Sequence, residues 1–410
     1  MSDEILVVAA EASGDRIAAL AARALAARGH AVYGAGGPAC RAAGVSLFAD
    51  TESLGAMGVT DVLRRIPLLA SVLARLADRV RRSPPRAALL VNATELSRRL
   101  APLLRALGVR VLWCVAPQVW AWRPGRLHAL RGAIDRLAVI LPFEEPLWRD
   151  AGVDAHYVGH PSLDVPAPPR GEMRARLGIA DGATAIAVLP GSRPGEVRRL
   201  ADPLAQAAAR LAGEGHSAAM ILAPGLPAEA QALARGAAAR ARLPVVMGDP
   251  DHGAAPLLPA FDLTLTASGT ASLEAALAGA APVVAYRLDA PSYALARLLV
   301  RTPHIALPNV LLGRRAYPEL VQDEVTPAAL AAAGKSLLLQ RSSREALPGE
   351  LRALLRPPSA TAAAPFGERL ARLMDPWLVG ASAAHPAPVE IVPASNACGA
   401  AGNPEGFEDP

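Results

Sequence analysis

The sequence predicts an α/β protein that consists of two Rossmann-like domains in succession, with a cleft between them. In both halves of the chain, short apolar segments typical of buried parallel strands alternate with helical segments. Four prolines between residues 161 and 170 separate the two halves and are typical of a linker. The length of 410 residues also exceeds what one ordinary core holds and suits two domains of comparable size.

The first half begins with a strand, a loop, a helix and a second strand, which is how a doubly wound sheet starts. Residues 5–10 are apolar and rich in β-branched side chains, as expected for a buried strand. We expect a tight turn at 11–15 and then a helix over 16–28 that ends at Gly29. The second strand starts at residue 31 and ends in the glycine-rich residues 34–37. Further strands are predicted at 87–91, 109–115, 137–141 and 155–158, with a helix over 95–107.

The second half repeats this alternation. Strands are predicted at 185–189, 219–222, 245–247, 263–266 and 282–286, with a helix over about 195–211. We expect an N-terminal domain at 1–165, a C-terminal domain at 166–355, a helical segment at 356–379 and a disordered, Ala/Pro/Gly-rich tail at 380–410. Ligands of such paired domains bind in the cleft, at the carboxyl ends of the strands.

Composition limits the classes of partner and cofactor. A net charge of +5 favours anionic partners, but the arginines are scattered and no nucleic-acid-binding motif is present, so we expect no nucleic acid. The cysteines Cys40, Cys114 and Cys398 form no disulfide framework and no zinc site, which indicates a reducing, cytoplasmic location. We expect no cofactor. Glu11 interrupts the N-terminal apolar run, which argues against a signal peptide. No apolar run reaches the roughly 18 residues of a spanning helix, so any membrane contact is expected to be peripheral.

Two strand-to-helix loops of the second half carry the strongest chemical signal. The first contains Gly191, Ser192, Arg193 and Glu196. Glycine lets a backbone approach a ligand, and amides at a helix start attract anions. Arginine adds a planar, permanently charged guanidinium that can bind phosphate through two N–H groups. This loop is therefore a candidate phosphate site.

The second loop contains Ser268, Gly269, Thr270 and Glu274. Its amides and hydroxyls suit a diphosphate, and the Glu274 carboxylate can accept hydrogen bonds from two ribose hydroxyls. Helix capping alone also explains one such loop, but two in neighbouring turns of one domain favour phosphate binding. A hydrolase nucleophile elbow fits poorly because Thr266 stands where glycine is needed, and no Walker A lysine is present.

The chain resembles the lipid-A-disaccharide synthases over about residues 5 to 355. The resemblance lies in ten segments in the family's order: AEASGD (10–15), MGVTDVL (57–63), APQVWAWRPGR (116–126), LPFEE (141–145), YVGHP (157–161), LPGSRPGEV (189–197), ASGTASLEAAL (267–277), VVAYR (283–287), LARLLVRTPHIALPNVLLGR (295–314) and PELVQDEVTP (318–327). The family implies a GT-B glycosyltransferase that joins UDP-2,3-diacylglucosamine to 2,3-diacylglucosamine 1-phosphate (lipid X) with inversion, releasing UDP. It implies no metal. On the UDP side it points to Arg193, Ser268, Gly269, Thr270, Glu274, Asn309 and Gln322.

The catalytic base is where the chain departs from the family. Inversion needs a group that removes the acceptor proton, and Glu11 and Asp15 lie in the first strand-to-helix loop. Asp15 has an equally good interpretation as a helix cap. The family usually has an aspartate after the strand near residue 90, where this chain has Asn92, with Glu95 in place of a second aspartate. Either Glu95 or Glu11 is the base, or Asn92 orients the acceptor while another group takes the proton, or activity is altered or lost.

Acylated substrates imply that the enzyme docks peripherally on the inner membrane. After Pro67, a plausible first-turn residue, Leu69, Val72, Leu73 and Leu76 recur at helical spacing beside arginines. An ordinary amphipathic helix packed on the sheet explains the same spacing. Trp120 and Trp122 could contact acyl chains or sugar but are equally typical of a core, and His160 is expected to be structural.

Two other functions remain open: a UDP-N-acetylglucosamine 2-epimerase-like enzyme, and a degenerate, non-catalytic UDP-sugar-binding relative. The first would need no lipid, and the second is favoured by Asn92. Nothing in the sequence fixes the oligomeric state, and a homodimer is compatible with it.

Overall fold

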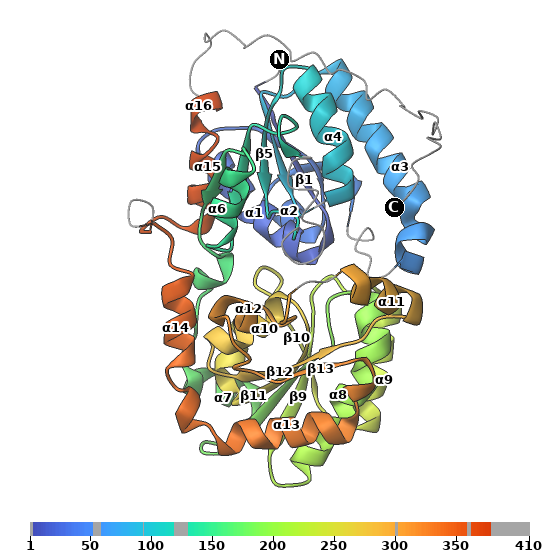
Figure 1. Ribbon diagram of the computed structural model, residues 1–410, viewed down its shortest axis with the longest axis vertical. Helices are drawn as coiled ribbons and strands as arrows, with labels where there is room; N and C mark the ends of the chain where they lie inside the picture. Colours follow the sequence, from blue (N-terminus) through green and yellow to red (C-terminus); the bar gives the residue numbers. More distant parts are fainter. Residues whose placement is uncertain are drawn as a thin grey trace, which may run out of the picture. The chain divides into compact units, whose positions relative to one another are not determined.

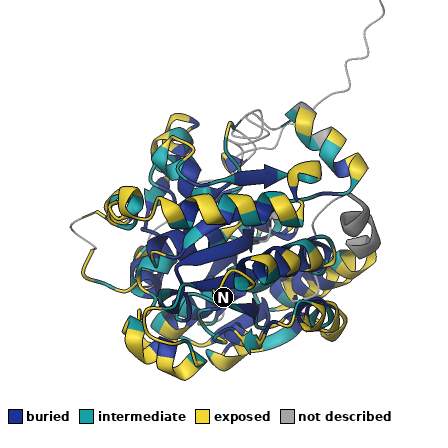
Figure 2. Ribbon diagram, turned by 90° about the horizontal axis from the view of Figure 1, so that it is seen from below, coloured by how far each residue is buried: buried dark blue, intermediate teal, exposed yellow. Residues whose placement is uncertain are grey.

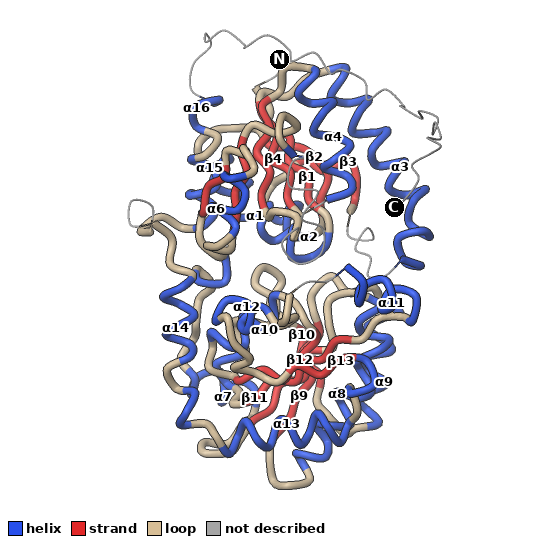
Figure 3. The backbone as a smooth tube through the Cα atoms, in the orientation of Figure 1, coloured by secondary structure: helices blue, strands red, loops and turns tan. Residues whose placement is uncertain are grey.

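The computed structural model describes residues 3–51, 59–92, 94–118, 130–299, 302–358 and 362–378. The chain forms two parallel sheets, and helices flank each of them (Figures 1 and 3). This confirms the prediction of two α/β domains. We call the sheet of β1–β7 with its helices the first domain and the sheet of β8–β13 with its helices the second domain.

The first sheet has seven strands in the order β3-β2-β1-β4-β5-β6-β7. Their bounds are β1 Ile5–Ala9, β2 Val32–Gly36, β3 Ser46–Asp50, β4 Ala87–Val91, β5 Arg110–Cys114, β6 Arg136–Val139 and β7 Ala155–Tyr157. All neighbouring strands run parallel. The strand order reverses between β1 and β4, which pair from Ile5 opposite Ala87 to Ala9 opposite Val91.

The second sheet repeats this topology with the order β10-β9-β8-β11-β12-β13. Its strands are β8 Ala185–Leu189, β9 Ser217–Leu222, β10 Val245–Met247, β11 Leu263–Ala267, β12 Ala281–Tyr286 and β13 Glu319–Val321. These neighbours are also parallel, and the reversal lies between β8 and β11. Each domain therefore has one switch point at which loops diverge to opposite faces of the sheet.

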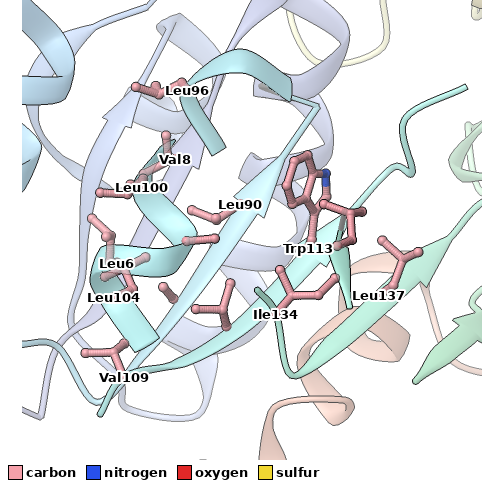
Figure 4. Close-up of a cluster of buried hydrophobic side chains, with 14 of the residues drawn as sticks. Leu6, Val8, Leu90, Leu96, Leu100, Leu104, Val109, Trp113, Ile134 and Leu137 are labelled. Carbon is pink, nitrogen blue, oxygen red and sulfur yellow. The ribbon is translucent and has the colours of Figure 1, made fainter. Parts of the chain in front are cut away.

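The side chains on both faces of the first sheet are buried, so its central strands are apolar throughout. Figure 2 shows strands coloured mainly as buried. One face is covered by α3 (Val59–Arg82) and α4 (Thr94–Ala106), and Figure 4 shows Leu96, Leu100 and Leu104 of α4 packed with strand residues. The other face is covered by α1 (Glu11–Ala27) and α2 (Pro38–Ala42). A short helix, α6 (Glu144–Asp150), precedes β7.

The second sheet is covered in the same way. On one face lie α8 (Pro194–Ala212), α9 (Ala228–Arg240) and α13 (Pro327–Leu339). On the other lie α7 (Arg170–Leu177) and α10 (Thr270–Leu277). Two further helices, α12 (Leu307–Leu312) and α14 (Leu347–Leu354), pack on α10. The remaining helix is α11 (Ala290–Leu299), and 3-10 turns span Pro161–Leu163, Leu258–Ala260, Gln322–Glu324 and Ser342–Arg344.

The last described helices, α15 (Phe366–Arg372) and α16 (Asp375–Leu378), pack on the first domain although they follow the second domain in sequence. Phe366 and Leu370 join the core cluster that contains β1 and α1. Arg28, the C-cap residue of α1, forms ion pairs with Glu368 and Asp375. The chain therefore crosses from the first domain to the second and back.

Two predicted element boundaries were wrong. Helix α1 begins at Glu11 rather than after residue 15, because the chain turns sharply at Glu11, whose φ is +64°, and enters the helix at once. Pro67 lies inside α3 rather than in its first turn. Proline has no N–H to donate, so α3 lacks one backbone hydrogen bond there.

The apolar stripe of α3 packs on the first sheet. Val72 and Leu76 are buried in the core, and Leu69 and Leu73 are partly buried against it. The structure thus assigns Val72 and Leu76 to the core, which differs from the membrane-facing role predicted for them, because one helix face cannot cover the sheet and a lipid surface at once. Within the described residues, no helix has the length and apolar character needed to cross a membrane.

Candidate active site

Four of the candidate residues mark the switch points of the two sheets. Glu11 follows β1 and Asn92 follows β4, the two strands between which the first sheet reverses. Arg193 follows β8 and Thr270 follows β11, the corresponding strands of the second sheet. Open α/β sheets bind ligands at the carboxyl ends of such strands. Sequence reasoning thus selected residues that share one topological position in each domain.

Glu11 and Arg193 connect the two domains directly. The Nη2 atom of Arg193 lies 2.5 Å from Oε2 of Glu11, although 182 residues separate them. Arg193 Nη1 also lies 3.0 Å from Oε1 of Glu196. Burial disfavours the charged guanidinium, but the carboxylates of Glu11 and Glu196 outweigh this effect and raise the pKa of Arg193 above its usual range. Arg193 is therefore a permanent cation held between the domains.

Glu196 organises the loop that carries Arg193. Its buried carboxylate accepts hydrogen bonds from the backbone N–H groups of Ser192, at 2.9 Å, and Arg193, at 3.3 Å. Gly191 has φ +120°, and a Cβ there would lie 2.4 Å from Oε2 of Glu196, so the loop requires glycine. We expected these amides to face a phosphate; instead they bind Glu196. The group that the loop offers to an anion is thus the Arg193 guanidinium.

The second loop leads from β11 into α10. Ser268 Oγ donates to the carbonyl of Ile305 at 2.9 Å, and Gly269 is the N-cap of α10 with φ +150°. Thr270 starts the helix, and Glu274 lies one turn further, almost fully buried. Burial raises the pKa of Glu274, while the charge of Arg16 in the first domain opposes the rise. The Ser268 hydroxyl thus stabilises the fold by holding the segment around Ile305, whereas Thr270 and Glu274 face a pocket.

That pocket is lined by residues of both domains. Thr270 and Glu274 border it from the second domain, together with His252 from the loop after β10. Arg16 of α1 and His160, which follows β7, border it from the first domain. Sequence reasoning missed Arg16 and His252 as site residues, because no local pattern around them indicates a ligand. No group of three or more His, Cys, Asp or Glu side chains in the described part of the chain is arranged to hold a metal ion.

Strained backbone marks the same region. Among described residues other than glycine, Glu11, Asn92, Val115 and Gln322 have positive φ and directly follow, or lie one residue past, the ends of β1, β4, β5 and β13. A non-glycine residue with positive φ costs free energy, and such residues cluster at functional sites. Arg242 is the only other described example, and it lies in a turn after α9.

The other candidate catalytic residues have distinct environments. Asn92 Nδ2 lies 3.3 Å from Ser13 Oγ, so the amide lies beside α1. The Asp15 carboxylate accepts hydrogen bonds from the N–H groups of Gly37, Ala39 and Cys40 at 2.7 to 3.2 Å. It therefore caps α2 rather than its own helix, and its oxygens are occupied. Glu95 lies in the first turn of α4, and its side chain is outside the described residues.

Asn309 and Gln322 bind protein groups. The fully buried Asn309 amide donates to Tyr317 O and Glu319 Oε1, both at 2.8 Å, and accepts from the N–H groups of Ala316 and Tyr317. Gln322 forms two hydrogen bonds with the backbone of Leu288. Both amides hold the segments around β13 in place. Trp120 and Trp122 lie outside the described residues.

His160 is a structural residue that makes stability depend on pH. Its buried imidazole accepts a hydrogen bond from the N–H of Ser162 through Nδ1 at 3.2 Å, and burial lowers its pKa to about 4. The unfolded chain, with a histidine pKa of about 6.5, binds the proton first, so stability is complete above pH 6.5 and is lost as the pH falls to about 4. The loss reaches about 2–3 kcal/mol at pH 4.5.

We therefore expect urea denaturation at pH 7 and pH 4.5 to show a smaller loss of unfolding free energy for His160→Asn than for wild type. Asparagine can accept the Ser162 hydrogen bond but does not titrate. The control variant His216→Asn changes a half-buried histidine before β9 and should keep the wild-type pH dependence. Equal losses in all three proteins would contradict the assignment.

Comparison with known proteins identifies the family of the chain and agrees with its fold. The family model described as lipid-A-disaccharide synthetase matches residues 5–353. The chain is 41% identical over 356 residues to the lipid-A-disaccharide synthase of Anaeromyxobacter sp. (strain K), covering 86% of this chain and 92% of the relative. It is 40% identical over 348 residues to that of Myxococcus xanthus, covering 83% and 89%.

Solved structures share the fold at low sequence identity. UGT89C1 of Arabidopsis thaliana, complexed with UDP, matches with a TM-score of 0.60 at 15% identity and covers 92% of this chain and all of the other. A UDP-N-acetylglucosamine 2-epimerase from Listeria monocytogenes, described as putative, matches with a TM-score of 0.58 at 11% identity, covering 91% and 95%. These likenesses support the GT-B fold alone. The family match covers every strand of both described sheets, and the chain belongs to the lipid-A-disaccharide synthase family, glycosyltransferases of lipid A biosynthesis.

Proposed function

We propose that the cleft transfers the diacylglucosaminyl group of UDP-2,3-diacylglucosamine to a hydroxyl of 2,3-diacylglucosamine 1-phosphate, releasing UDP. Family membership supports the reaction class. The observation that carries the proposal is the contact between Glu11 and Arg193. It places a candidate base 2.5 Å from a cation that can stabilise the leaving diphosphate.

The second domain supplies the donor side in this proposal. Arg193 binds the diphosphate and offsets the negative charge that develops on it as the bond to the sugar breaks. Thr270 lies at the first turn of α10, where a hydroxyl and the helix dipole favour a phosphate. The Glu274 carboxylate accepts hydrogen bonds from the ribose hydroxyls. Glu196 and Gly191 act indirectly, by fixing the loop of Arg193.

The first domain supplies the acceptor side. The acceptor hydroxyl attacks the anomeric carbon as the bond to the UDP oxygen breaks, and the Glu11 carboxylate takes the hydroxyl proton. One displacement of this kind inverts the anomeric centre. Asn92 cannot take a proton, because an amide is not a base at neutral pH; its Nδ2 lies beside Ser13 and orients the acceptor. The strained backbone at Glu11 and Asn92 supports a functional role for both.

We also propose that the enzyme meets its acylated substrates at the inner membrane surface. The substrates' acyl chains are the main support. On α3, Leu68 is 39% exposed, whereas Val72 and Leu76 belong to the core, so any lipid contact of this helix uses its outward face.

The test is a transfer assay in detergent with UDP-2,3-diacylglucosamine and labelled 2,3-diacylglucosamine 1-phosphate. Wild type should form the disaccharide 1-phosphate. Asn92→Ala should lower kcat/KM by about tenfold because it loses one orienting hydrogen bond, and Asn92→Asp should stay within about threefold of wild type. If Asn92→Asp raised kcat by a hundredfold, residue 92 rather than Glu11 would be the natural position of the base. No disaccharide from a wild type that binds UDP would identify a non-catalytic binder.

A further inference from the structure

Three charged side chains of α1 reach across to the second domain. Glu11 pairs with Arg193, and Arg23 pairs with Asp251 at 2.7 Å. Between them in sequence, Arg16 lies against Gly253, where an added Cβ would be 2.2 Å from its Nη1 atom. These contacts place one helix of the first domain over the residues that we assign to the donor.

The Glu11 carboxylate lies at the position where we expect the diphosphate of the donor to bind. Arg193 is the cation that we assign to the diphosphate, and its Nη2 atom is bound by the Glu11 carboxylate. A carboxylate and a phosphate present the same planar pair of acceptor oxygens to a guanidinium, so both use the same donor atoms. One guanidinium edge cannot bind both fully at once.

Arg16 has the equivalent position in the part of the pocket that we assign to the ribose. It lines the same pocket as Glu274 and Thr270, and its positive charge acts on the Glu274 carboxylate. Glu274 is the group that we assign to the ribose hydroxyls. Each of the two charged side chains of α1 thus lies beside a donor-binding side chain of opposite charge: Glu11 beside Arg193, and Arg16 beside Glu274.

We propose that α1 competes with the donor nucleotide: Glu11 occupies the diphosphate position on Arg193, Arg16 occupies the ribose position beside Glu274, and the nucleotide binds by displacing both. This inference rests on the proposed function. It has a consequence for the order of binding. Glu11 is free to serve the acceptor only after the diphosphate has taken its place on Arg193, so donor binding precedes productive acceptor binding.

The test compares UDP affinities by isothermal titration calorimetry in full-length wild type and Glu11→Gln. If Glu11 competes with the diphosphate, Glu11→Gln should bind UDP about fivefold more tightly, as expected for the loss of a partly exposed competing ion pair. Glu145→Gln removes a carboxylate that pairs with Arg149 at 2.8 Å within the first domain, and it should bind UDP as wild type does. Unchanged or weaker UDP binding by Glu11→Gln overturns the proposal, as does equal tightening by Glu145→Gln.

Arg16 is tested with uridine, because a neutral ligand does not respond to the loss of a positive charge. Arg16→Gln should bind uridine severalfold more tightly by NMR titration, and unchanged binding overturns the ribose part. Arg193→Gln separates this proposal from the proposed function. If Arg193→Gln binds UDP as wild type does, the donor site itself is wrongly assigned. If it binds UDP weakly while Glu11→Gln fails to tighten, only the competition by α1 fails.

Discussion

Glu11→Gln is expected to lower kcat by about 10³-fold, within the range that general-base catalysis contributes. Glutamine keeps the size and the hydrogen-bonding capacity of the side chain but cannot accept the acceptor proton. The measurement is disaccharide formation at saturating concentrations of both substrates.

Glu145→Gln is a matched control for this variant. The Glu145 side chain is 24% exposed, close to the 23% of Glu11, and it also pairs with an arginine, at 2.8 Å, but within the first domain. Its kcat should equal that of wild type. A Glu11→Gln enzyme with a kcat within about threefold of wild type would remove Glu11 from the chemistry and leave Glu95 as the next carboxylate to test.

Arg193→Gln should lower kcat/KM by about 10²- to 10³-fold, as the loss of one preorganised charge at a leaving group does. The decrease should appear in kcat as well as in KM, because charge on the diphosphate grows as the sugar–oxygen bond breaks. Arg193→Lys should recover only part of the activity, since an ammonium cannot make the paired hydrogen bonds of a guanidinium.

The control for Arg193 lies in α8, the helix that begins directly after Arg193. Arg198 is exposed on α8, so Arg198→Gln removes the same charge a short distance away and should retain wild-type kcat/KM. A defect confined to KM in Arg193→Gln would assign Arg193 to ground-state binding only and would contradict its role at the leaving group.

The central strands were predictable from sequence because a strand buried on both faces is apolar at every position, as Ile5–Ala9 and Ala185–Leu189 are. β3 and β13 were not. The edge strand Ser46–Asp50 carries exposed polar ends, and Glu319–Val321 has only three residues, so neither has the expected pattern. They are strands because each one pairs with the edge of a sheet that other strands have formed, and not because of their own composition.

The two phosphate-type loops were predictable because glycine, hydroxyl residues and a helix start are adjacent in sequence. The roles of individual residues within them were not. Glu196 was expected to bind UDP and instead binds the amides of its own loop, and Asn309 is enclosed in a buried network. Arg16 was missed because its significance comes from Gly253 and Glu274, which are remote in sequence. A contact between two domains leaves no pattern in the sequence around either residue.

The packing of α15 and α16 has a consequence for how the protein is made. The core around β1 and α1 includes Phe366 and Leu370, and Arg369 donates to the carbonyl of Val158 at 2.7 Å. During synthesis these residues leave the ribosome long after the first sheet has been translated, and domains generally begin to fold in the order in which they emerge. The second domain, whose sheet ends at β13, can finish its core before that point. The domain that is synthesised first is therefore completed last.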